Sequence, residues 1–153
     1  METRQITDSK EKEQIAKRIL TALPDWFAIP ESTAEYIRES QSMPFWTAFA
    51  KDEAVGFLAL KETSKHAAEI YVAGVLPAHH RKGIGRQLFH AFKAYAAAHG
   101  YQFLQVKTVR RGCCDEYDRT CAFYESLGFV ALECFPTLWD ESNPCQLYIM
   151  SIK

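Results

Sequence analysis

The sequence lacks the features that mark membrane, secreted and nucleic-acid-binding proteins. No apolar run approaches the about 18 residues of a membrane-spanning helix. The N-terminus, Met-Glu-Thr-Arg-Gln, is polar and has no signal-peptide core. The formal net charge is −1, so there is no overall excess of basic residues to attract nucleic acid. We therefore expect a cytoplasmic protein with neither nucleic acid nor membrane as a partner.

The chain also lacks a cysteine pattern. Its cysteines are odd in number, two of them are adjacent, and no Cys-x-x-Cys occurs; they are Cys113, Cys114, Cys121, Cys134 and Cys145. A disulfide framework or a zinc site normally requires paired cysteines at regular spacing. We expect reduced, mostly packed thiols and no metal.

What the chain does have is enough apolar material for one substantial core. It contains 153 residues, of which 48% are hydrophobic and 24% charged, as is ordinary for a globular protein. Since one domain is usual at this length, we expect a single domain over residues 1–153.

The most informative stretch runs from residue 68 to residue 100. Residues 68–75 are apolar and rich in β-branched side chains, which predicts a buried strand ended by Pro77. The basic turn 81–86 follows, and apolar residues then recur every fourth position to residue 96, which predicts a helix. A glycine-bearing turn before a helix N-terminus can bind an anion through its free N–H groups. Alone, this pattern also fits a solvated helix start or a nucleotide-binding domain.

The rest of the chain predicts strands and helices in the order β-αα-β-β-β-α-β-α-β-β. Asp8 suits an N-cap for the first helix, which ends before Pro24. We expect the other elements at 2–7, 31–41, 45–51, 54–62, 102–109, 118–127, 129–134 and 146–152, with a loop at 135–144.

Three separated motifs in this order resemble those of the GNAT superfamily of acyl-CoA-dependent N-acetyltransferases. They are the strand at 68–75, the turn His80-Arg-Lys-Gly-Ile-Gly85, and the segment Tyr117-Asp-Arg-Thr-Cys-Ala-Phe-Tyr-Glu-Ser-Leu-Gly-Phe129. The resemblance covers nearly the whole chain. It implies an α/β (α+β) fold with a mixed, mostly antiparallel sheet of six to seven strands and helices on both faces. His80 and Tyr117 depart from the family, which usually has Gln or Arg, and often Asn, at these positions.

The resemblance also implies where acetyl-CoA binds as cosubstrate. Backbone groups of Ala73 and Val75 would pair with the pantetheine arm as an added strand would. The turn would hold the pyrophosphate through His80, Arg81, Lys82, Gly83, Ile84, Gly85 and Arg86, and Tyr117 would contact the cofactor by its hydroxyl.

Two residues match the family's catalytic positions. Glu69 stands where some members place the general base, and the alternative is a surface or salt-bridged glutamate. Tyr124 matches the general acid for the departing thiolate, and the alternative is a packed helix tyrosine. A phenol of pKa about 10 can protonate a thiolate of pKa about 8.5 at little cost. No base adjoins Cys113 or Cys114, so direct attack in a ternary complex is preferred to a covalent acetyl-cysteine.

The acceptor is expected to be a primary amine of a small molecule. Trp26, Phe27, Glu31, Glu35 and the loop 111–117 are expected to border it, and the acidic residues hint at a polyamine or aminoglycoside. A protein or peptide amine and a catalytically inactive CoA-binding sensor are the alternatives, and a homodimer is left open. A Glu69 buried in a salt bridge, with no passage to the thioester, would favour the inactive sensor.

Overall fold

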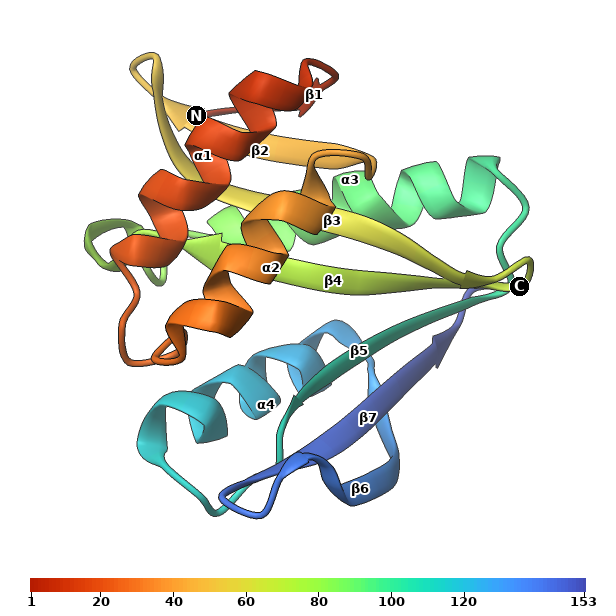
Figure 1. The fold of residues 1–153 in the computed structure, drawn as a ribbon. Helices are drawn as coiled ribbons and strands as arrows, with labels where there is room; N and C mark the ends of the chain where they lie inside the picture. Colours follow the sequence, from red (N-terminus) through yellow and green to blue (C-terminus); the bar gives the residue numbers. More distant parts are fainter.

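The computed structural model describes residues 1–153 as one seven-stranded sheet with helices on both faces (Figure 1). The strands are β1 (Glu2–Ile6), β2 (Phe45–Ala50), β3 (Glu53–Ser64), β4 (Ala67–Val75), β5 (Phe103–Val109), β6 (Val130–Asp140) and β7 (Asn143–Ser151). The α-helices are α1 (Ser9–Thr21), α2 (Pro30–Ser40), α3 (Ile84–Ala98) and α4 (Asp115–Leu127), and a short 3₁₀ turn covers Pro77–His79.

The sheet order is β1-β2-β3-β4-β5-β7-β6, and every neighbouring pair is antiparallel except β4 and β5. The predicted fold class and element order are confirmed. None of the helices is both long enough and apolar enough to cross a membrane.

Two apolar cores lie on opposite faces of the sheet. The side chains of α1, including Ile19 and Leu20, pack with Phe45 and Phe57 on one face. The side chains of α3, including Leu88 and Phe92, pack on the other face, where α4 contributes Cys121. Helices α1 and α2 thus lie on one face of the sheet, and α3 and α4 lie on the opposite face.

The starts of α1 and α3 form as the sequence predicts. The carboxylate of Asp8 accepts a hydrogen bond from the backbone N–H of Glu11 at 2.8 Å, which caps α1. Gly83 precedes α3 with a φ of +79°, in the left-handed region where glycine carries no steric penalty.

Strands β4 and β5 pair only at one end. Their parallel register runs from Ala67–Phe103 to Ile70–Val106 and then stops, although both strands continue. The β3–β4 register shifts at the same point, because Leu60 pairs with Ile70 and Ala59 with Val72, leaving Tyr71 as an extra residue. A bulge of this kind bends a strand and increases its twist. We call the divergence of β4 and β5 beyond Ile70 and Val106 the fork (Figure 1).

Two expectations about boundaries are wrong. Helix α4 begins at Asp115, three residues before the predicted start, because acidic residues in its first turn suit the positive end of the helix dipole. The expected loop at 135–144 is mostly strand, since β6 continues to Asp140. Pro136 is tolerated there because β6 is an edge strand, and the β6–β7 register is irregular between Phe135 and Asp140.

Candidate active site

The open edge of β4 presents main-chain groups toward the fork. In an antiparallel pair, alternate residues direct both backbone groups at the partner strand. The N–H of Leu76 donates to the carbonyl of Val55 at 2.8 Å, so residues two apart in β4, such as Gly74, also face β3. The backbone groups of Ala73 and Val75 therefore point the other way, toward the fork, where no strand pairs with them.

His80 occupies the far end of this edge. Its Nε2 donates to the carbonyl oxygen of Val75 at 2.6 Å, and its ring lies edge-on to Trp26 with centroids 5.7 Å apart. The carbonyl of Val75 thus already accepts one hydrogen bond, while both backbone groups of Ala73 face the fork without a strand partner. Because a carbonyl oxygen has two lone pairs, the Val75 carbonyl can accept a second bond from an added ligand.

The basic turn forms the start of α3. The first helical bond there is from the N–H of Gln87 to the carbonyl of Gly83, so the preceding N–H groups have no helical acceptor. Arg81, with a φ of +62°, and Lys82 are exposed. A Cβ on Gly85 would lie 3.0 Å from the Phe123 ring, so Gly85 allows α3 to approach α4 closely. The turn therefore offers backbone donors and positive charge to an anion.

Glu69 lies at the apex of the fork, within the last two paired positions of β4. Its side chain is only 6% exposed, and its Oε1 accepts from Lys107 Nζ at 2.9 Å and from Gln105 Nε2 at 3.0 Å. Lys107 is the first residue of β5 beyond the pairing. The structure thus places the predicted base in a buried ion pair.

A cavity of about 120 Å³ reaches this ion pair from the α2 side of the sheet. Its walls are three aromatic side chains, from α2, β4 and β6, three charged ones and one aliphatic one: Tyr36, Tyr71, Trp139, Lys61, Glu69, Lys107 and Ile70. Of these only Glu69 is a predicted site residue. Buried Glu69 is therefore reachable from outside, and the cavity ends beside the open edges of the fork.

Tyr124 projects from α4 into a half-buried position against Phe129 and Tyr148. Burial raises the pKa of its phenol, and Cys121, Tyr117 and Tyr36 raise it further to a smaller extent. The raised pKa favours the protonated phenol, which is the form that a general acid requires.

Tyr36 connects the two predicted catalytic residues. Burial raises the pKa of Tyr36, and the charges of Glu35, Glu69 and Cys145 add to that rise. Since Tyr36 in turn raises the pKa of Tyr124, it lies within electrostatic reach of both Glu69 and Tyr124. Its ring also meets that of Tyr71, with centroids 5.3 Å apart. Tyr36 thus lies between the elements that carry Glu69 and Tyr124, which are 55 positions apart in the printed numbering.

Two hydrogen bonds tie the loop between α1 and α2 to α4. The Tyr117 hydroxyl donates to the carbonyl of Trp26, and Trp26 Nε1 donates to Thr120 Oγ1 at 3.2 Å. Tyr117, predicted to contact the cofactor, is therefore engaged with Trp26. We call these two bonds the Trp26 bridge; it joins elements from the two sides of the fork.

The other predicted acceptor-border residues do not reach the apex. Glu31 and Glu35 are exposed on α2, and neither lines the cavity at Glu69. Cys113 and Cys114 are exposed free thiols. The structure has no group of three or more His, Cys, Asp or Glu side chains arranged to hold a metal ion.

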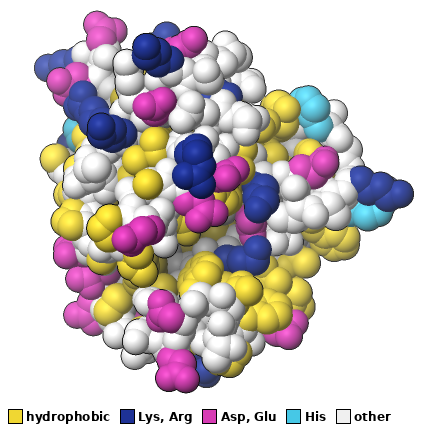
Figure 2. Space-filling model, viewed as in Figure 1, with side chains coloured by type: hydrophobic (Ala, Val, Ile, Leu, Met, Phe, Trp, Pro, Cys, Tyr) yellow, Lys and Arg dark blue, Asp and Glu magenta, His cyan; other side chains and the backbone are white.

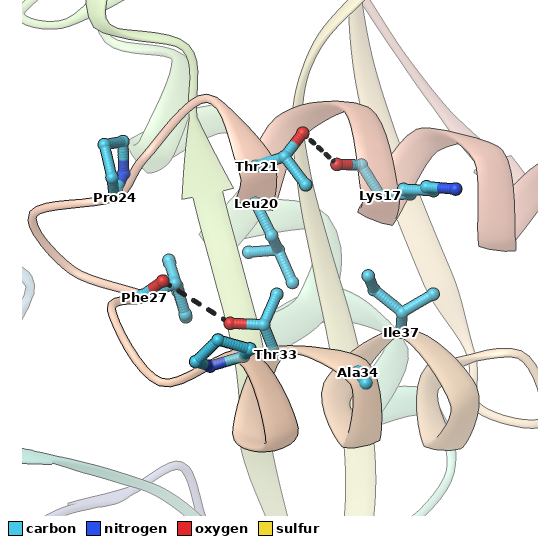
Figure 3. A pocket seen from close by; sticks show the side chains of 9 residues that line it. Lys17, Leu20, Thr21, Pro24, Phe27, Thr33, Ala34 and Ile37 are labelled. Atoms are coloured by element: carbon cyan, nitrogen blue, oxygen red, sulfur yellow. Dashed lines mark hydrogen bonds between the residues drawn. The ribbon is translucent and has the colours of Figure 1, made fainter.

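A larger cavity, of about 350 Å³, lies elsewhere, between α1, α2 and their connecting loop (Figure 3). Leu20, Phe27 and Ile37 form apolar walls, and its threonine hydroxyls donate to carbonyls of their own segment: Thr21 to Lys17 at 2.7 Å and Thr33 to Phe27 at 3.5 Å. Its one titratable side chain is that of Lys17 and it has no carboxylate, so the apex of the fork is the better candidate for the chemistry.

The missed residues of the site are Lys107, Lys61, Tyr36, Tyr71 and Trp139. One signal was available for Lys107: in a strand, Gln105 and Lys107 share a face by alternation, and two polar residues on one face of an otherwise apolar strand indicate a polar neighbour. The parallel register that brings them to Glu69 is set by tertiary packing and has no local sequence signal.

A sequence model described as the acetyltransferase (GNAT) family matches residues 12–129 of the chain. The chain belongs to this family. The match includes all three motifs and the fork, so the recognition made from the motifs is confirmed.

This GNAT protein resembles one relative by sequence and several solved structures by fold. An uncharacterized N-acetyltransferase, YsnE of Bacillus subtilis (strain 168), is 31% identical over 99 residues, which are 65% of this chain; the chain spans 64% of that protein's length. A putative GNAT acetyltransferase of Desulfovibrio desulfuricans has a TM-score of 0.83 at 18% identity and covers 99% of each chain. An aminoglycoside 6'-N-acetyltransferase complexed with coenzyme A has a TM-score of 0.79 at 18% identity, covering 100% of this chain and 98% of that one. These two structures show the same fold.

Proposed function

We propose that this protein is an N-acetyltransferase that moves an acetyl group from acetyl-CoA to a primary amine of a small molecule. The observation that carries the proposal is the fork: an open strand edge at Ala73 runs from a buried carboxylate, Glu69, toward a basic helix start at Arg81–Arg86. An open strand edge can bind the amide groups of a long thioester, and a basic helix start can bind its pyrophosphate. The structure of a related fold complexed with coenzyme A supports the same ligand.

The residues present fit acetyl-CoA along its length. The unpaired N–H and C=O of Ala73 would bind the amide groups of the pantetheine arm. The free N–H groups at the start of α3, with Arg81, Lys82 and Arg86, would hold the pyrophosphate, while Gly83 keeps the approach clear and Gly85 lets α3 pack against Phe123 of α4. When bound, acetyl-CoA supplies the thioester whose acetyl carbon the amine attacks, so that a C–N bond forms as the C–S bond breaks.

The proton movements fall to Glu69 and Tyr124. Glu69 would accept a proton from the attacking amine, through a water molecule in the cavity beside it. To do so the carboxylate must give up part of its bonding to Lys107. The Tyr124 hydroxyl would donate toward the departing sulfur. Because burial raises the pKa of Tyr124, we expect a hydrogen bond that strengthens as charge develops on sulfur rather than early proton transfer.

One observation favours a second candidate, a CoA-binding protein without catalysis. Two features would mark an inactive sensor: a Glu69 buried in a salt bridge, and no passage to the thioester. The first is present, because Glu69 is buried in an ion pair with Lys107. The second is the lack of a passage to the thioester, and the cavity that reaches Glu69 from outside is an argument against it. We therefore place catalysis first.

The test is an acetylation screen over amine classes with released CoA thiol as one readout and the mass of the acetylated product as the other. Exposed Cys113 and Cys114 would react with a thiol reagent, so an acetyl-CoA-free blank is subtracted. Acetyl-CoA binding with product formation supports the enzyme. Binding without transfer to any amine supports the sensor, and no binding at all contradicts both.

A further inference from the structure

We infer that the acceptor of this enzyme is a small zwitterion with an aromatic group. It carries a primary amine, a neighbouring carboxylate and one aromatic ring system, as an aromatic amino acid does. The inference rests on the proposed function and names the acceptor class for the cavity at the apex of the fork. The cavity's charges, aromatic walls and size each support it.

The charges that line the cavity leave one cation in excess. Glu69 is matched by Lys107 at 2.9 Å, whereas Lys61 forms no ion pair with any carboxylate of the protein. Lys61 lies over the Tyr71 ring, with Nζ 5.4 Å from the centroid. An acceptor carboxylate would supply the anion that Lys61 lacks, within a site where the nearest carboxylate is already paired.

Two further carboxylates, those of Glu35 and Glu39 on α2, lie outside this cavity but act on one of its wall residues, Tyr71. Burial raises the pKa of Tyr71 to about 12, and Glu35 and Glu39 of α2 are among the charges that add to that rise, which places them near this phenol. Arg38 of α2 acts in the opposite direction. Acidic and basic side chains stand side by side on this face of the molecule (Figure 2). A cavity lined by two lysines, Lys61 and Lys107, and one carboxylate, Glu69, matches a molecule that carries both charges.

The remaining walls are flat and apolar. Tyr36 and Tyr71 meet edge to face, and Trp139 of β6 is 42% exposed where it lines the cavity. An exposed indole beside a reactive group offers a stacking surface for a ring of the acceptor. An acceptor without such a ring would leave this surface in water.

The size of the cavity excludes large acceptors from its interior. Its volume is about 120 Å³, below the about 300–1,000 Å³ of pockets for drug-sized ligands. One ring or a short chain fits there, and an aminoglycoside would remain mostly outside. A linear polyamine would fit by width, but its extra positive charges would face Lys61 and Lys107.

The experiment compares acceptors that differ by the carboxylate alone. Phenylalanine and phenethylamine, and tryptophan and tryptamine, are each assayed for kcat/KM with acetyl-CoA, alongside spermidine and kanamycin. We expect each amino acid to exceed its decarboxylated partner by at least about tenfold, the usual effect of one charge-assisted contact. Lys61→Met should reduce this preference toward one. Lys65→Met removes an exposed lysine outside the cavity and should retain the preference.

The outcomes separate this inference from the proposed function. Faster acetylation of phenethylamine, tryptamine, spermidine or kanamycin than of the amino acids would overturn the zwitterion and leave the enzyme intact. A preference for the amino acids that survives Lys61→Met would overturn the role of Lys61. If neither amino acid is acetylated although calorimetry shows acetyl-CoA binding, the acceptor class is wrong; absence of acetyl-CoA binding contradicts the proposed function itself.

Discussion

Glu69 and Lys107 join β4 and β5 at the point where the two strands part, with Oε1 and Nζ 2.9 Å apart. Glu69 belongs to the last paired residues of β4, and Lys107 is the first residue of β5 beyond the pairing. The carboxylate is 6% exposed, so removing either partner would leave the other charge poorly compensated. The ion pair therefore holds the two strands together at the start of the fork, and it also sets the environment of the carboxylate that we propose as the general base.

We predict that Glu69→Gln lowers kcat at neutral pH at least tenfold, by about 10²–10⁴ if general-base assistance is of ordinary size. Glutamine keeps the shape of the side chain but cannot accept the proton. The deficit should shrink as pH rises, because a growing fraction of the amine is then already deprotonated. The pH dependence of kcat/KM for both proteins measures this.

The matched control for that variant is Glu62→Gln. Glu62 lies on β3 and accepts from the Tyr101 hydroxyl at 2.6 Å, away from the apex cavity. This variant should retain the rate. A Glu69→Gln profile that coincides with the unmutated enzyme would remove Glu69 from the mechanism and return it to a purely structural ion pair.

We predict that Tyr124→Phe keeps acetyl-CoA affinity while kcat falls at least tenfold, since general-acid assistance is worth about 10²–10⁴. The ring contacts with Phe129 and Tyr148 remain, so stability should change little. Burial raises the pKa of Tyr124, which keeps the proton on the phenol at alkaline pH. The rate ratio of the two proteins should therefore stay constant from about pH 7 to about pH 10, the pH at which an ordinary tyrosine is already half ionised.

Tyr101→Phe is the control for Tyr124→Phe, because it also removes one hydroxyl, at a position outside the cavity. A donor whose thiol has a lower pKa than that of CoA should shrink the Tyr124→Phe deficit, since such a leaving group needs less help. Full activity of Tyr124→Phe on acetyl-CoA would show that Tyr124 is a packing residue only.

We predict that Gly83→Asp weakens acetyl-CoA binding at least about tenfold, because a carboxylate then occupies the N-terminus of α3 where the pyrophosphate would bind. Gly100→Asp is a close control. Gly83 and Gly100 have φ of +79° and +82°, and a Cβ at either meets no atom within 4 Å. Both variants therefore carry similar backbone strain at opposite ends of one helix. Equal affinities in calorimetry would contradict phosphate binding at the turn.

We predict that Tyr117→Phe weakens acetyl-CoA binding about fivefold, the effect of losing one hydrogen bond worth about 1 kcal/mol. The variant releases the Trp26 carbonyl and loosens the loop that α4 holds across the fork. Thr120→Val, which removes the acceptor of Trp26 Nε1, should act in the same direction. Tighter binding in either variant would show that the Trp26 bridge obstructs the cofactor instead of retaining it.

Local patterns sufficed for most of the fold. Asp8, the apolar repeat of α3 and the glycine at 128 mark helix ends that the structure confirms within a few residues. Pro136 misled because a proline ends a central strand but is tolerated on an edge, and position within the sheet is a tertiary property. The sheet order that makes β6 an edge strand has no local signal.

The helix start at 81–86 could be predicted because all of its residues are neighbours in the sequence. The site was not predictable where the fold joins distant segments. Lys107 meets Glu69 only because β4 and β5 run parallel for four residue pairs, and Trp26 meets Tyr117 only across the fork. The Tyr117 hydroxyl, predicted to contact the cofactor, donates to the Trp26 carbonyl, and neither segment alone predicts this bond.

The fork has a consequence for the energy of the folded state itself. The sheet leaves two strand edges unpaired in its interior, where a ligand can bind only when the chain is folded. Such a ligand stabilises the folded state relative to the unfolded one. At a hundredfold excess over its dissociation constant such a ligand contributes about 2.7 kcal/mol. In a domain of this size that corresponds to a rise in melting temperature of about 5–11 °C. The amount of folded protein in a cell would thus follow the supply of acetyl-CoA, since the unfolded fraction is what proteases remove.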